Sequence, residues 1–139
     1  TSIGLDRMFL AVLSNSFCEE ELGNGEIRSV LKIPAVLAPF KAAVLPLTKK
    51  DGMPEKAKEI MKLIQLNFNC QYEEKDSIGK RYRRHDAIGT PYCITVDHQT
   101  IKDNTITLRD RDSMSQERVS VEKLNSIILE KVSVKNYLD

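Results

Sequence analysis

The sequence has 139 residues, of which 41% are hydrophobic and 29% are charged, and its formal net charge at pH 7 is +1. This length suits one compact domain, or one domain with part of a neighbour, and the composition excludes a disordered, collagen-like or coiled-coil chain. A net charge this close to zero creates no overall field that attracts nucleic acid, so any such binding must come from local patches.

The first 40 residues are predicted to contain one helix and one strand. Apolar residues recur at helical spacing from Leu5 to Phe17, which predicts an amphipathic helix from about Leu5 to Cys18. The acidic, glycine-containing stretch 19–25 is expected to be a loop, and the alternating segment 26–33 a strand. Two prolines then interrupt the pattern, and we place a domain boundary near residues 34–40.

From Lys41 onward, the pattern predicts alternating strands and helices. The apolar run 42–45 predicts a buried strand, and an apolar stripe after Pro54 predicts a helix. The further expected elements are a strand at 70–72, a helix from about Ile78 to Ile88, a strand at 92–96, a polar loop at 98–104, a strand at 105–109, a brief strand at 118–121 and a terminal helix. The strands at 92–96 and 105–109 are predicted to form a hairpin. This order predicts an α/β fold with a mixed, mostly parallel sheet flanked by helices.

Cysteine usage indicates a reducing compartment. Cys18, Cys70 and Cys93 show no paired spacing, and only two histidines could join them, so we expect no metal site and no disulfide framework. No basic leader precedes an apolar stretch at the N-terminus, and the longest apolar run is shorter than the about 20 residues that span a membrane. These features predict a cytoplasmic protein without a membrane partner.

The densest cationic cluster is the segment 80–84, Lys-Arg-Tyr-Arg-Arg. On a helix, Lys80 and Arg84 share a face, and the ring of Tyr82 could stack on a base or pack inward. Single-stranded RNA is bound by cations that hold its phosphates and by planar groups that stack on its bases. The alternative is a solvated helix face that pairs with nearby glutamates.

A second cluster, Arg109, Asp110, Arg111 and Asp112, ends the predicted hairpin. A carboxylate beside a guanidinium matches cytosine, whose exocyclic amine donates to Asp and whose ring acceptors bind Arg. In an extended strand, however, the two arginines face one side and the two aspartates the other, so all four contact one nucleotide only if the strand ends or bulges. A turn shaped by Asp112 is the structural alternative. The sequence shows no Walker loop, dinucleotide fingerprint, HExxH motif or nucleophilic triad.

Four stretches together resemble glycyl-tRNA synthetase of the class II, α2 type. Residues 2–13, which begin Ser-Ile-Gly-Leu-Asp-Arg, resemble the third signature motif of class II synthetases and the helix that it begins. Residues 37–47 resemble the join to the anticodon-binding domain, and residues 77–91 and 109–116 resemble two internal segments of that domain. The resemblance implies that residues 1–36 end a class II catalytic domain and that residues 37–139 form an anticodon-binding domain.

The resemblance also implies an activity for the larger enzyme, a glycine–tRNA ligase. Such enzymes use ATP and Mg²⁺ to convert glycine to glycyl-adenylate, and then transfer the glycyl group to glycine tRNA. By family likeness, Arg7 is the catalytic motif-three arginine that contacts ATP, and Ser2 lies near the bound glycine. Class II motifs one and two would precede Thr1, so the 139 residues alone are expected to be non-catalytic, and a homodimer would form mostly through the missing part.

The tRNA-binding residues implied by the family position complete the prediction. Glycine anticodons end in two cytosines, so the expected contact residues are Lys80, Arg81, Arg84, Arg109, Asp110, Arg111 and Asp112. Ala87 departs from the glutamate that the family commonly has at its position. Two alternatives remain open at this point: a non-catalytic, synthetase-like accessory subunit of a DNA polymerase, and a free-standing interaction module of flavodoxin-like shape.

Overall fold

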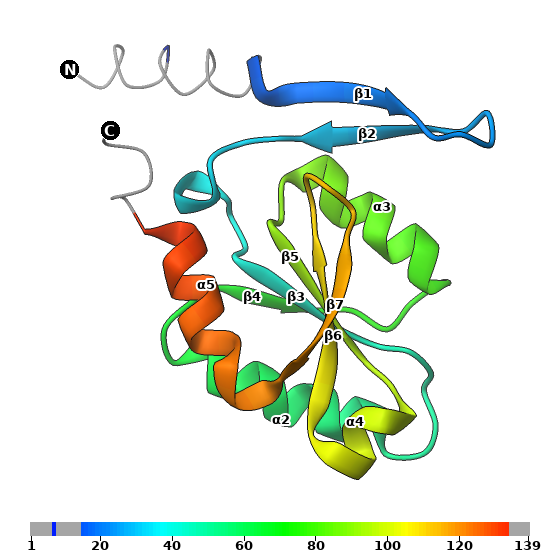
Figure 1. Cartoon of the computed structure of the whole chain (residues 1–139), viewed down its shortest axis with the longest axis vertical. Helices are drawn as coiled ribbons and strands as arrows, with labels where there is room; N and C mark the ends of the chain where they lie inside the picture. Colours follow the sequence, from blue (N-terminus) through cyan, green and yellow to red (C-terminus); the bar gives the residue numbers. More distant parts are fainter. Residues whose placement is uncertain (1–6, 8–14, 134–139) are drawn as a thin grey trace.

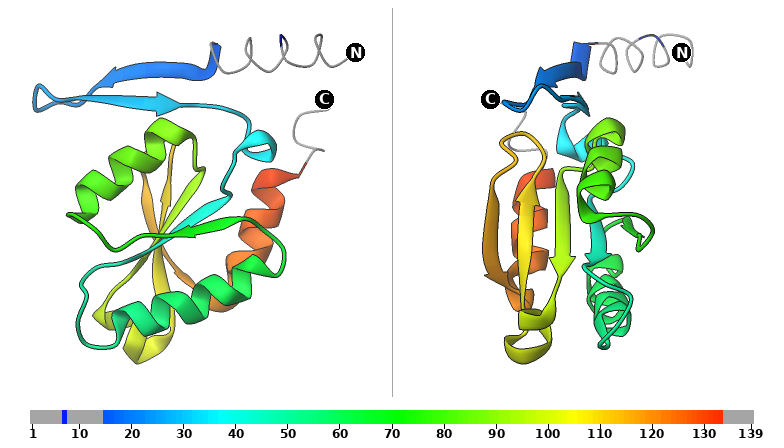
Figure 2. Two further views of the ribbon diagram at one scale, coloured as in Figure 1. Left: turned by 180° about the vertical axis from the view of Figure 1, so that it is seen from behind. Right: turned by 90° about the vertical axis from the view of Figure 1, so that its right-hand side faces the viewer.

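A two-stranded ribbon precedes a five-stranded sheet in the structure, a computed structural model that describes residue 7 and residues 15–133 (Figure 1). The ribbon consists of β1 (Phe17–Glu21) and β2 (Ile27–Leu31), which pair antiparallel. It lies at one end of the molecule, across helix α3 (Ile78–Ile88), and apart from the larger sheet (Figures 1 and 2).

Strand β1 corrects the prediction for the N-terminal region. Arg7, Asn15 and Ser16 are helical, and the other residues of the predicted helix before Phe17 lie outside the described part of the chain. Phe17 and Cys18, expected in that helix, belong instead to a strand that includes the first three residues of the predicted acidic loop and ends at Glu21. Every residue of β1 is paired with a residue of β2. Such cross-strand pairing outweighs a local helical spacing.

The connection between ribbon and sheet is a short 3₁₀ turn, η1 (Ala35–Leu37). Carbonyl groups of this turn and of its C-cap residue, Ala38, converge on one cation, because Lys41 Nζ donates hydrogen bonds to the oxygens of Ala35, Val36 and Ala38 at 3.0, 2.8 and 2.8 Å. Burial lowers the pKa of Lys41. The predicted domain boundary falls in this connection and stays a prediction.

The five-stranded sheet has the order β4-β3-β5-β6-β7. Strand β3 lies parallel to both β4 and β5, whereas the β5–β6 and β6–β7 pairs are antiparallel. The sheet is therefore mixed, as predicted, but its pairs divide evenly between the two kinds and are not mostly parallel. Short connections explain the antiparallel half, since a parallel crossover needs a dozen or more residues. The remaining bounds are β3 (Ala42–Pro46), α2 (Met53–Gln65), β4 (Cys70–Tyr72), β5 (Tyr92–Val96), α4 (His98–Asp103), β6 (Thr105–Asp110), β7 (Gln116–Ser120), η2 (Val121–Lys123) and α5 (Leu124–Val132).

Helices cover both faces of the sheet. Alternate residues of β3 point to opposite sides, as the pleat requires. Ala42 and Val44 belong to the larger core, which includes buried side chains of α2 and α5. Ala43 and Leu45 belong to a smaller core against Ile78 and Tyr82 of α3. The wholly apolar composition of β3, with all five of its residues buried, follows from this two-sided packing.

Helix α4 replaces the polar loop predicted at 98–104. Asp97 and Thr100 form a capping box, in which the Asp97 carboxylate accepts from the Thr100 backbone N–H at 3.1 Å and the Thr100 hydroxyl accepts from the Asp97 N–H. These two bonds satisfy amide groups that the first turn of a helix leaves open. The segment thus folds into a short helix despite its polar composition.

The same Asp97 carboxylate ties α4 to β7. Arg118 donates to its two oxygens at 2.7 and 2.9 Å, and these bonds lower the pKa of Asp97 from its ordinary 3.8 to about 2. A carboxyl group whose pKa is depressed by folding stabilises the folded state above its unfolded pKa, and that contribution disappears as the pH falls through the folded pKa.

Replacing Asp97 with Asn should therefore reduce stability only where this carboxyl group is ionised. We expect the variant to lose about 1 to 2 kcal/mol of unfolding free energy at pH 6. The loss is this modest because the ion pair is partly exposed and solvent screens it. The difference from the parent should shrink between about pH 4 and pH 2, since both proteins then lack the charge. Urea unfolding at several pH values measures this. Asn caps helices as well as Asp does, so a pH-independent deficit would show that the ion pair contributes nothing.

Candidate nucleic-acid interface

Helix α3 exposes some of its cations and buries others. Ser77 caps it by accepting from the Lys80 N–H, and Gly89 ends it in the left-handed conformation. Lys80 is exposed, and the side chains of Arg83 and Arg84 are about two-fifths exposed, at 39% and 40%. These three cations line a hollow of about 460 Å³ together with Gly79 and Glu26. Arg84 forms ion pairs with Asp76, at 2.7 Å, and with Glu73.

Arg81, by contrast, points into the molecule. It is 2% exposed, and its Nη1 donates to the carbonyl oxygens of Pro46 and Glu73 at 2.7 and 3.1 Å. Burial lowers its pKa. Arg81 therefore connects α3 to the end of β3 and to the residue after β4, and its guanidinium is closed to an external ligand.

Tyr82 and His85 also face inward. The Tyr82 hydroxyl shares a hydrogen bond of 2.6 Å with Thr95, and its ring lies 4.7 Å from the Arg109 guanidinium carbon. His85 is 1% exposed between Thr90 and Glu73, with ring nitrogens 3.0 and 2.9 Å from their side-chain oxygens. Burial lowers the pKa of His85. The packing alternative holds for Tyr82, whose ring is engaged within the protein.

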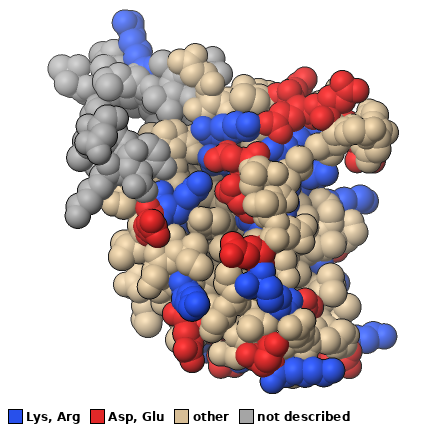
Figure 3. All heavy atoms as spheres, in the orientation of Figure 1, with Lys and Arg blue, Asp and Glu red and all other residues tan. Residues whose placement is uncertain are grey.

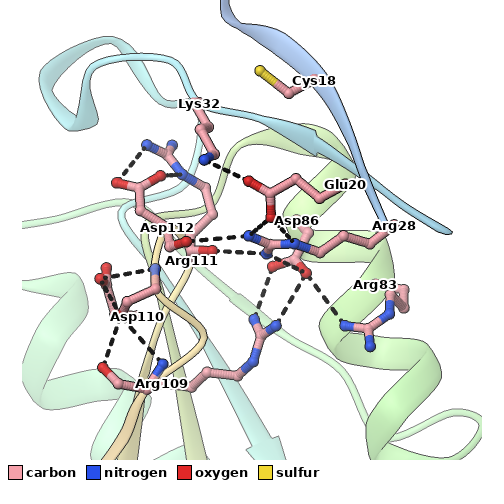
Figure 4. Close-up of polar contacts among 12 residues, drawn as sticks. Cys18, Glu20, Arg28, Lys32, Arg83, Asp86, Arg109, Asp110, Arg111 and Asp112 are labelled. Atoms are coloured by element: carbon pink, nitrogen blue, oxygen red, sulfur yellow. Dashed lines mark hydrogen bonds and ion pairs between the residues drawn. The ribbon is translucent and has the colours of Figure 1, made fainter. Parts of the chain in front are cut away.

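A buried ionic cluster joins α3, β6 and the ribbon (Figure 4). Its centre is Asp86, which is 0% exposed and accepts from Arg109 at 2.8 and 3.1 Å and from Arg28 at 3.1 Å. Arg83 lies 3.6 Å from the same carboxylate. Burial alone would lower the pKa of Arg109, but the hydrogen bonds to Asp86 and the attraction of nearby negative charge, that of Asp86 foremost, together raise that pKa above its ordinary value. Each buried charge in the cluster thus has an opposite charge beside it, as burial requires.

Arg111 and Asp112 belong to the turn after β6. Arg111 is 4% exposed, and its guanidinium donates to the Gly89 carbonyl at 2.9 Å and to the Asp112 carboxylate at 3.0 Å. The Arg111 N–H donates to the Pro91 carbonyl at 3.0 Å. The Asp112 side chain is 39% exposed, so it is the member of this pair that can reach an outside group.

Asp110 points to the opposite face of the sheet from the two arginines. It lines a cleft of about 510 Å³ between β6, β7 and α5, together with Tyr92, Arg118 and Lys131. One of its oxygens accepts from Ser113 at 2.9 Å, and the other lies 3.8 Å from Lys131 Nζ and has no hydrogen bond. The alternation expected for an extended strand holds for Arg109 and Asp110. The strand ends at Asp110, so Arg111 and Asp112 lie in the turn and contact each other, and the four residues do not share a face.

The prediction that the guanidinium and carboxylate groups of these clusters form one open surface is wrong. Arg81, Arg109 and Arg111 are buried and form hydrogen bonds within the protein, so they present no open guanidinium face to a base. Helix α3, which carries the cationic segment 80–84, does lie beside the second cluster, residues 109–112, because Asp86 of α3 binds Arg109 directly. On the face shown in Figure 3, lysines and arginines are interspersed with aspartates and glutamates, and form no single cationic patch. Whether any of the named residues contacts tRNA stays a prediction.

Sequence reasoning missed the residues that hold this region together, Arg28, Asp86 and Glu20. A signal existed for two of them. Arg28 stands two positions from buried Val30, on the inward side of a strand, and Asp86 continues the helical row of Ile78 and Tyr82. A charge at an inward position needs a buried partner of opposite charge.

The described part of the chain lacks two other kinds of feature. It contains no group of three or more His, Cys, Asp or Glu residues arranged to hold a metal ion. Within the same residues, no helix is both long enough and apolar enough to cross a bilayer. Of the two residues predicted to act in the catalytic domain, Arg7 is helical and exposed, and Ser2 lies outside the described residues.

Comparison with known proteins places these features in a family context. Residues 41–131 match the family model described as "Anticodon binding domain". The chain is 53% identical over 131 residues to the glycine–tRNA ligase of Clostridium tetani. The aligned region covers 94% of this chain and 28% of that protein. It is 44% identical over 137 residues to the glycine–tRNA ligase of Borrelia hermsii, covering 99% of this chain and 30% of that protein. The resemblance found in the sequence is confirmed, and the chain spans less than a third of these relatives.

A solved structure shares the fold. The crystal structure of the RNA binding domain of threonyl-tRNA synthetase from Cryptosporidium parvum matches with a TM-score of 0.64 and 24% identity, over 72% of this chain and 25% of that one. The α/β prediction, with a mixed sheet flanked by helices, is thereby confirmed. These comparisons give no support to the polymerase-subunit alternative.

Proposed function

Because this chain belongs to the anticodon binding domain family, we propose that it forms the anticodon-binding part of a glycine–tRNA ligase. The observation that supports this most strongly is the identity of about 50% with glycine–tRNA ligases over 94% of the chain. The proposed partner is the anticodon arm of glycine tRNA. The proposal extends from the matched residues 41–131 to the ribbon, because the ribbon is bonded to them through Arg28.

The proposed contacts with tRNA come from the exposed side chains. Lys80, Arg83 and Arg84 line one hollow, and three cations at one site suit the phosphates of a loop. The Asp112 carboxylate is open enough to accept from a base amine. Buried Arg81 and Arg109 would act by fixing α3 and β6, not by touching a nucleotide.

The activity proposed for the whole enzyme is the synthesis of glycyl-tRNA from glycine, ATP and tRNA, through glycyl-adenylate. Arg7, which is helical and exposed, would contact ATP, and Ser2 would lie near glycine. The described residues offer no cluster that fits Mg²⁺, so no step is assigned to that ion. A cytoplasmic homodimer is proposed on the family likeness.

Charge removal on α3 in the full-length ligase tests the proposed contact surface. The double substitution Lys80→Gln and Arg84→Gln should raise KM for glycine tRNA about tenfold and reduce the slope of log KM against log salt concentration by about 2. Glycine-dependent pyrophosphate exchange should stay unchanged, because it does not involve the anticodon.

The matched control removes two charges from α2, by Lys56→Gln and Lys62→Gln. These lysines lie on the helix that covers the opposite face of the sheet, so neither activity should change. An equal effect of the two double variants on KM, or equal losses of exchange and aminoacylation, would contradict the proposed surface. Failure of the parent enzyme to distinguish glycine tRNA from a tRNA with an altered second anticodon letter would contradict the proposed function itself.

A further inference from the structure

Arg28 of the ribbon uses every hydrogen-bond donor that an arginine has. Its Nε and Nη2 donate to Glu20 Oε2 at 2.8 and 2.6 Å, and its Nη1 donates to Asp86 at 3.1 Å. Its Nη1 and Nη2 also donate to the backbone carbonyls of Arg111 and Asp112, at 2.8 and 3.2 Å. A guanidinium has five N–H groups in a fixed plane, so these contacts leave no donor free and allow no rotation.

The acceptors come from three separate parts of the chain (Figure 4). Glu20 lies on the neighbouring strand of the ribbon, Asp86 on α3, and the two carbonyl groups in the turn after β6. Arg28 is 1% exposed, so water does not compete for these bonds. The guanidinium thus fixes the backbone of the turn relative to α3 and to the ribbon.

The bond to Asp86 extends this control to β6. Asp86 binds Arg109 through both of its oxygens, and one of these oxygens also accepts from Arg28. The position of Arg109 and the path of the backbone at Arg111 and Asp112 therefore depend on the same buried guanidinium. Arg28 lies outside the residues 41–131 that match the anticodon binding family.

We propose that Arg28 is a positioning residue for the turn Arg111–Asp112, so that a ribbon outside the matched domain sets the geometry with which Asp112 meets a nucleotide. The inference rests on the proposed function, because it assigns the turn to tRNA binding. Arg28 itself touches no nucleotide. Its effect passes through two backbone carbonyls and through Asp86.

Substitution Arg28→Lys in the full-length ligase tests this role. Lysine keeps the charge but has three donors on one atom and no planar fork, so it cannot hold Glu20, Asp86 and both carbonyls together. We expect discrimination between glycine tRNA and a tRNA with an altered second anticodon letter to fall about tenfold, with KM for glycine tRNA raised and pyrophosphate exchange unchanged. A residue that serves only stability would lower the melting temperature and leave discrimination at the parent value.

Two companion variants make the result decisive. Lys32→Gln removes the other cation on Glu20 without touching Arg28 and should behave as the parent. Glu20→Gln leaves an amide oxygen that still accepts from Arg28, so its loss of discrimination should be smaller than that of Arg28→Lys. If Arg28→Lys does not fold, the Glu20→Gln variant tests the proposal in its place. Unchanged discrimination in a folded Arg28→Lys, or in Glu20→Gln when the lysine variant is unfolded, overturns the inference. A parent enzyme that does not discriminate overturns the proposed function, and this inference with it.

Discussion

Replacing Asp86 with Asn is expected to lower the free energy of unfolding by about 3 to 5 kcal/mol, because breaking a buried ion pair leaves an uncompensated charge. Here one carboxylate serves two guanidinium groups, those of Arg28 and Arg109, which are 1% and 3% exposed. Asparagine has nearly the same shape, so the substitution removes charge without opening a cavity. Its amide nitrogen would also place a donor against the donors of an arginine.

Urea unfolding followed by circular dichroism measures this loss. Asp76→Asn is the matched control, since Asp76 also pairs with an arginine of α3, but both partners are about two-fifths exposed. Its unfolding midpoint should stay close to that of the parent, because exposed pairs contribute little. A midpoint for Asp86→Asn within the error of the parent would show that solvent or a shift of side chains satisfies the two arginines.

The sheet and its main helices could be predicted because their signals are local. The apolar run of β3, the helical stripe of α2 and the β-branched composition of β5 each reflect burial on a face that the period of the element defines. The two errors in element type have the opposite origin. Strand β1 exists because β2 pairs with it, and α4 exists because two side chains cap its first turn.

The candidate site was less predictable because its contacts are distant in sequence. Asp86 is separated by 58 positions from Arg28 and by 23 from Arg109, and no periodicity links residues so far apart. Residue type was informative about chemistry but not about exposure. Arginines that suit a nucleic-acid surface suit a buried ionic cluster equally well, since a guanidinium forms the same bonds with phosphate, carboxylate and carbonyl oxygens.

Alternation along β6 nevertheless separated Arg109 from Asp110 as expected. Arg109 lies on the side of the sheet that α3 covers, where Tyr82 and Asp86 surround it. Asp110 lies on the other side, beside α5. A sequence of alternating charges therefore produces two separate environments, and the one buried against α3 needs Asp86 to compensate its charge.

Substitution of Gly89 by Ala should have a similarly large effect, at the point where α3, the ribbon and the turn meet. Gly89 has a φ of +84°, and an added Cβ would lie 2.8 Å from Ile33 Cγ2 and 3.2 Å from Leu31 Cδ2. The left-handed conformation costs an alanine about 1 to 2 kcal/mol, and overpacking a core adds about 1 to 3 kcal/mol. We therefore expect a loss of about 2 to 5 kcal/mol in urea unfolding.

The control Gly25→Ala separates the two causes. Gly25 has nearly the same φ, +86°, but no atom lies within 4 Å of the position that an added Cβ would take, so it should lose only the backbone contribution of about 1 to 2 kcal/mol. The excess loss at Gly89 then measures how tightly the end of β2 is packed on the end of α3. Because Arg111 donates to the Gly89 carbonyl, a shift there also disturbs the turn. Equal losses in the two variants would mean that Leu31 and Ile33 yield freely, and that the ribbon is held to α3 by the ionic cluster alone.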